Sequence, residues 1–82
     1  MKIVYVIYDC LAKQFGTNAF VYPSDEVARR EFIAMLSKVD VGILKDLKIY
    51  RLGKLVDEDE SVDFFAMELF MLGNDAVRKE VL

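Results

Sequence analysis

The chain has 82 residues, of which 55% are hydrophobic, and it carries a formal net charge of −3. This length predicts a single domain covering residues 1–82. The acidic balance argues against the broad basic surface of a strong, sequence-independent nucleic-acid binder. With no His, no Trp and one Cys, few side chains remain for nucleophilic or metal chemistry, so we expect no enzyme activity, cofactor, metal or small-molecule substrate.

The lone Cys10 cannot form an intramolecular disulfide, and such a thiol is typical of a reducing compartment. The apolar run at residues 3–8 is too short for a signal peptide. The longest apolar stretch near the C-terminus, residues 64–72, is interrupted by Glu68 and is far shorter than the ~20 residues of a membrane span. We therefore expect a cytoplasmic protein with no membrane contact.

The hydrophobic fraction of 55% exceeds the usual ~45–50%. A domain this small buries only roughly 60% of the surface of its unfolded chain, so much apolar surface is left over. Homodimers are the commonest soluble oligomers and cover such surface. The composition therefore predicts a homo-oligomer, most simply a dimer.

Residues 2–9 are rich in β-branched and aromatic types and predict a strand. Both faces of this strand are apolar, so it should be central in a sheet or covered on both sides. Residues 9–18 contain Gly16 and Asn18 and predict a loop or a short helical turn. Residues 19–22 predict a short strand that ends at Pro23, which cannot donate to a ladder.

A helix is predicted to begin after Ser24, a good N-cap, with Asp25 and Glu26 in the first turn where the helix dipole favours acids. Apolar residues then recur at helical spacing and should form the buried stripe: Ala28, Phe32, Met35, Leu36 and Val39. The helix should fade between residues 39 and 42.

The last third of the chain predicts a hairpin. Residues 47–56 favour a strand, and residues 57–61 form a polar turn at the hairpin tip. Residues 64–72 suit either helix or strand by composition, and the hairpin context favours strand. Residues 75–82, capped by Asn74, predict a short amphipathic helix. The fold class is therefore α+β: a small antiparallel sheet of three to four strands, one main helix packed on it, and a short C-terminal helix.

Single-strand binders combine cations along a groove with aromatic rings on which bases stack. Alternation along a strand puts Lys48, Tyr50, Leu52 and Lys54 on one face, with two cations beside one ring. Spacing alone favours the alternative that these lysines merely protect an edge strand against aggregation. The candidate nucleic-acid site comprises these and nearby cationic residues: Arg29, Arg30, Lys48, Tyr50, Arg51 and Lys54.

Several short motifs occur in order. They are Tyr-Val-Ile-Tyr-Asp at residues 5–9, Ala12 with Phe15-Gly16, Asp-x-x-Ala-Arg-x-x-Phe at residues 25–32, Ile-Tyr-Arg-Leu-Gly at residues 49–53, and the acids of residues 57–60. In this order the chain resembles the small nonstructural protein of gokushovirus-type microviruses, which are phages with circular single-stranded DNA genomes. The likeness covers residues 1–60 and stops before Phe64.

The resemblance implies a nonstructural accessory protein in the host bacterial cytoplasm that binds single-stranded DNA weakly and assists genome production. The cations would contact phosphates, and Tyr50 a base. A second hypothesis is a dimeric protein-interaction module without a nucleic-acid role, whose apolar C-terminal third docks a second copy or a viral or host protein. Arg29, on the flank of the helix stripe, could reach the sheet edge, a phosphate, or an acid such as Asp9.

Overall fold

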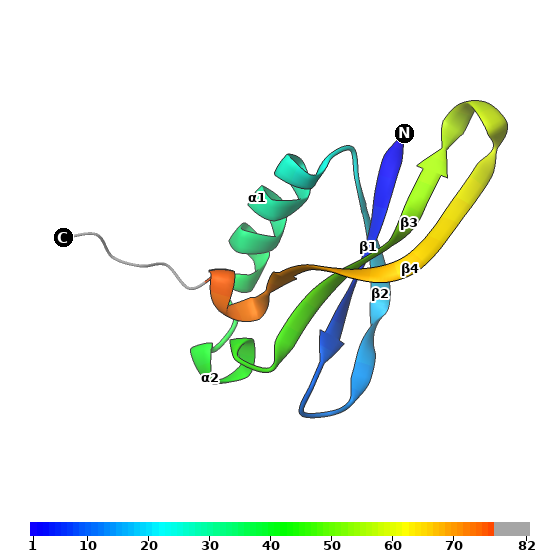
Figure 1. Cartoon of the computed structure of the whole chain (residues 1–82). Coiled ribbons are helices and arrows are strands. Elements are labelled where there is room, and N and C mark those ends of the chain that lie inside the picture. The colour runs from blue at the N-terminus through cyan, green and yellow to red at the C-terminus, as the bar shows by residue number, and fades with distance from the viewer. Residues whose placement is uncertain (77–82) are drawn as a thin grey trace.

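A computed structural model describes residues 1–76 of the chain. Its elements follow the order β1 (Lys2–Asp9), β2 (Gln14–Tyr22), α1 (Asp25–Leu36), α2 (Val41–Leu44), β3 (Leu47–Val56) and β4 (Ser61–Leu72), with 3₁₀ turns at Asp57–Asp59 and Gly73–Ala76. The strands form one antiparallel sheet in the order β2-β1-β3-β4, and α1 packs on one face of it (Figure 1). The α+β class, with four strands and one main helix, is confirmed.

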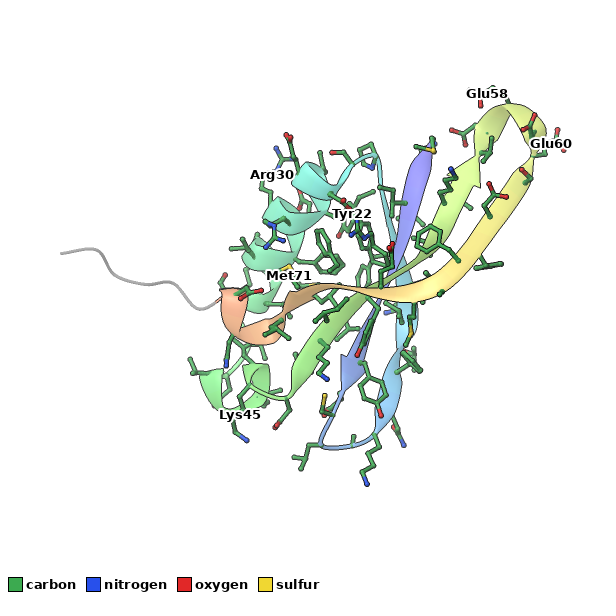
Figure 2. All side chains as sticks on the ribbon, viewed as in Figure 1. Tyr22, Arg30, Lys45, Glu58, Glu60 and Met71 are labelled. Atoms are coloured by element: carbon green, nitrogen blue, oxygen red, sulfur yellow. The ribbon has the colours of Figure 1, made fainter. Side chains whose placement is uncertain are left out.

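The first strand is central, as its two apolar faces predict. β1 pairs with β2 on one side and with β3 on the other. Tyr5, in the middle of β1, is fully buried beneath α1 and lies edge-on to Phe32 of the helix, with ring centroids 5.7 Å apart. The core therefore lies between this face of the sheet and α1, where Tyr22 and Met71 also point (Figure 2).

The main helix begins where the sequence predicts. The Ser24 hydroxyl accepts a hydrogen bond from the Val27 amide at 3.2 Å, which satisfies one of the free N–H groups of the first turn. The stripe of Ala28, Phe32 and Leu36 is buried against the sheet. Within residues 1–76, no helix is long and apolar enough to cross a membrane.

The loop predicted over residues 9–18 is too long: residues 10–13 form a turn, and β2 already begins at Gln14. Asp9 closes a tight turn by accepting hydrogen bonds from the Leu11 and Ala12 amides at 2.9 and 3.1 Å. Lys13 adopts a left-handed φ of 56° before the chain returns. Phe15 then packs on Tyr8 with ring centroids 4.9 Å apart, so cross-strand pairing overrides the low β-propensity of Gly16 and Asn18.

The C-terminal hairpin is confirmed: residues 64–72 belong to β4, which pairs with β3 from Ser61 to Leu72 with two irregularities in the register. Glu60, at φ 49°, lets the chain reverse at the tip, and the hairpin extends away from α1 with Glu58 and Glu60 at its end (Figures 1 and 2). After β4 the chain forms the 3₁₀ turn Gly73–Ala76. The helix predicted for residues 75–82 falls mostly on residues 77–82, which lie outside the described residues.

Candidate binding face of the sheet

The sheet has two unlike faces. Directly opposite residues of an antiparallel pair share a face, so the strand register assigns each side chain. Along β1, Ile3, Tyr5 and Ile7 belong to the core beneath α1. Val4 and Val6 point the other way: they are buried, yet they are not part of that core cluster. We call this second side, which α1 does not cover, the open face.

The open face is apolar across all four strands. Val4 lies opposite Val21 of β2, and Val6 lies opposite Tyr50 of β3, which in turn lies opposite Leu69 of β4. The remaining register positions extend the same surface toward both ends of the sheet and add Lys2, Tyr8, Phe15, Ala19, Lys48, Gly53, Leu55, Val62, Phe64 and Leu72.

Exposure of large apolar side chains distinguishes this face. Phe64 is 75% exposed, Leu69 51% and Phe15 49%. Val4 and Val6, by contrast, are shielded at the centre by their neighbours on the same face. A continuous apolar surface of this kind, rather than single scattered residues, marks an interaction site.

The few charges on the open face lie at its ends. Lys48 sits at the start of β3, opposite Tyr8 and Leu72. Lys2 sits at the other end and forms an ion pair with Asp57 at 3.3 Å. Among the paired strand positions of residues 2–72, no carboxylate falls on this face: Asp63 and Glu68 lie opposite Lys54 and Arg51 on the helix side.

The predicted set Lys48, Tyr50, Leu52 and Lys54 does not share one face. Lys48 and Tyr50 do lie together on the open face. A bulge follows: Arg51 lies opposite Tyr5 and Gly53 opposite Val4, so Leu52 is the extra residue. Beyond the bulge, the alternation of side chains between the two faces of the sheet is shifted by one residue. Lys54 therefore lies opposite Ile3 on the helix side.

The candidate arginines belong to the helix side as well. Arg51 donates from Nη1 to Asp25 at 2.5 Å, and its guanidinium lies 5.5 Å from the Phe70 ring centroid. Arg29 lies 5.0 Å from the same centroid and donates to the Phe70 carbonyl at 3.4 Å. Arg29 thus reaches the edge strand β4, one of the alternatives expected for it, and does not pair with Asp9.

Asp25 connects this cluster to the core. Its other carboxylate oxygen accepts a hydrogen bond from the Tyr5 hydroxyl at 2.6 Å. Burial raises the pKa of Tyr5 well above its usual value, and the hydrogen bond to the Asp25 carboxylate raises it further. This network fastens the first turn of α1 to β1 and β3.

Arg30 is the last of the predicted residues, and it points away from the sheet (Figure 2). It pairs with Glu31 at 3.3 Å, on the exposed side of α1. Of the six candidates, the structure therefore brings together Lys48 and Tyr50 on the open face, and Arg29 and Arg51 around Phe70. Within residues 1–76, no three His, Cys, Asp or Glu side chains gather as they would around a metal ion.

Most residues of the open face were not predicted as functional. The two apolar sides of residues 2–9 already indicated that both faces of the sheet need cover. The positions of Val21, Phe64 and Leu69, however, depend on the strand register, which the sequence does not give. No family model, curated protein or solved structure matches this chain.

Proposed function

We propose that this chain is a protein-interaction module that binds an apolar protein surface through the open face. The observation that carries the proposal is the apolar surface that continues across β2, β1, β3 and β4 with exposed side chains such as Phe64 and Leu69. In water this surface is costly, and a partner that covers it gains roughly 25 cal/mol for each Å² of apolar area buried.

The resemblance over residues 1–60 gives this module a context. It supports a role as a nonstructural accessory protein of a single-stranded DNA phage, in the cytoplasm of the host. In our proposal the accessory role is exercised through protein contact. The cations support this choice, because Arg51 is engaged with Asp25, Arg30 with Glu31, and Lys54 faces the helix side.

Anilinonaphthalene sulfonate, a dye that fluoresces on exposed apolar surface, tests the proposed binding face. The dye is titrated into a dilution series of the folded protein that extends to concentrations low enough to free the face. At dilutions where the wild type is monomeric, we expect enhanced fluorescence from it and weaker fluorescence from Leu69→Glu, which puts a charge on the open face. Ile33→Glu, on the exposed side of α1, is the matched control and should retain it.

The dye result can contradict the proposal directly. If the wild type is monomeric and does not bind the dye, or if Leu69→Glu binds it as well as Ile33→Glu does, the open face is not an apolar binding surface. Circular dichroism of each variant shows whether the comparison is made between folded proteins.

A second candidate function is weak binding of single-stranded DNA by the same face. It is favoured by the aromatic rings that share the face with Lys48, which are Tyr8, Phe15, Tyr50 and Phe64. Such rings can stack on bases while a lysine contacts phosphate.

Fluorescence anisotropy with labelled oligo-dT at low and moderate salt decides between the two functions. Binding that weakens with salt, and falls in Lys48→Glu but not in the helix-side control Lys54→Glu, would support the DNA function. Our proposal expects no binding of oligo-dT at tens-of-micromolar protein.

A further inference from the structure

We infer that the protein covering the open face is a second copy of this chain, packed sheet against sheet around a two-fold axis. The inference rests on the proposed function, since it names the partner of the same face. Two such copies form a sandwich of two inner sheets with one helix layer on each outer side. Stacked sheets pack about 10 Å apart, with interdigitating side chains from their inner faces.

The size of the face comes close to what a stable dimer needs. Four strands about 4.8 Å apart make a sheet roughly 20 Å wide, and eight residues at about 3.3 Å each make it roughly 26 Å long. The flat area is on the order of 500 Å², and the relief of the side chains increases the accessible area that is buried. This approaches the roughly 800 Å² per partner of a standard protein interface.

The distribution of charge on the face also suits self-association. Its centre is formed by uncharged residues such as Val6 and Leu69, while Lys48 and Lys2 lie at opposite ends of the sheet. A specific interface has the same plan, with an apolar core and a polar rim. A lysine at the rim can lay its aliphatic stem on the partner and keep its ammonium in water.

A two-fold dimer brings the same patch of both copies together. A carboxylate at the centre of the face would lie near the same carboxylate of the second copy, and the two charges would repel. The paired strand positions of residues 2–72 place no carboxylate on this face. The hydrophobic fraction of 55%, high for a chain of 82 residues, is then explained by a core that two chains complete together.

Sedimentation equilibrium tests the second copy. We expect the wild type at high-micromolar concentration to have twice the mass of one chain. Leu69→Glu should raise the dissociation constant about 100-fold or more, because it buries an unpaired charge in an apolar interface. Val21→Glu, on β2, makes the same test from the other side of the face if Leu69→Glu folds poorly. The control Ile33→Glu should remain dimeric.

The outcomes separate this inference from the proposed function. A wild type that stays monomeric while Leu69 still controls dye binding overturns the second copy and leaves the protein-binding face standing. A monomer without Leu69-dependent dye binding overturns both. A dimer that survives both Leu69→Glu and Val21→Glu in folded form uses another surface, and the inference is then wrong.

Discussion

At the scale of single residues, Asp25 joins three elements through its two carboxylate oxygens. It lies in the first turn of α1, accepts a hydrogen bond from Tyr5 of β1 at 2.6 Å, and pairs with Arg51 of β3. Tyr5 is fully buried, and the Asp25 carboxylate accepts the hydrogen bond of its hydroxyl. An unsatisfied buried donor costs more than an average hydrogen bond is worth, which makes Asp25 a structural residue.

We expect Asp25→Ala to lower the free energy of unfolding by about 2 kcal/mol, because the Tyr5 hydroxyl and the Arg51 guanidinium lose their acceptor. Asp25→Asn keeps one side-chain oxygen and should lose less. Urea unfolding followed by circular dichroism measures both changes. Equal losses in the two variants would show that the acceptor oxygens are not what stabilises this junction.

Tyr5 makes the stability depend on pH on the alkaline side. Its pKa is raised in the folded protein by burial and by Asp25, so the folded state holds the phenolic proton where the unfolded chain releases it. This stabilisation is complete below the unfolded value of about 10 and is lost as the pH rises above it. Urea unfolding at pH 8 and above pH 10 should therefore show a smaller alkaline loss in Tyr5→Phe than in the wild type. An equal loss of unfolding free energy between the two pH values in Tyr5→Phe and the wild type would contradict this.

At the scale of elements, the features that depend on neighbouring residues could be predicted from the sequence. Ser24 caps α1, and β1 is a central strand. Both features could be predicted because a cap and a strand with two apolar faces are each recognised from a short stretch of sequence. The start of β2 was missed because Gly16 is a poor strand former, and the strand is paired there through Phe15 with Tyr8 and Gln14 with Asp9. The face of Lys54 was predicted wrongly because the bulge at Leu52 is fixed by tertiary pairing.

The close approach of β3 and β4 at Gly53 can be tested by substitution. A Cβ at Gly53 would clash with the Asp63 carbonyl oxygen and come within 3.1 Å of the Phe64 Cα, both backbone atoms of β4. Gly53→Ala should therefore force the strands apart and destabilise the protein by about 1–3 kcal/mol. Gly16→Ala is the matched control, since its Cβ would meet only the Ile7 carbonyl oxygen at an ordinary 3.6 Å. Similar unfolding free energies for the two variants would refute the close approach.

At the scale of the whole molecule, the sequence predicted a site made of cationic residues on one strand and helix, whereas the structure presents an apolar surface that spans four strands. Lys48 and Tyr50 could be placed together from simple alternation, and the apolar excess already predicted self-association. The open face itself could not be predicted, because its residues come from four strands whose order and register are tertiary facts. Arg29 and Arg51 look available in the sequence, yet the fold engages both beside Phe70.

If two open faces complete one core, folding and association are linked. The melting temperature of the wild type should then rise with protein concentration, by about 3–5 °C for each tenfold increase, because the dimer is favoured by mass action. Leu69→Glu should melt lower and at a temperature independent of concentration, whereas Ile33→Glu should follow the wild type. Thermal unfolding at several concentrations measures this, and a wild-type midpoint that does not move with concentration would mean that each chain is stabilised by its own helix–sheet core alone.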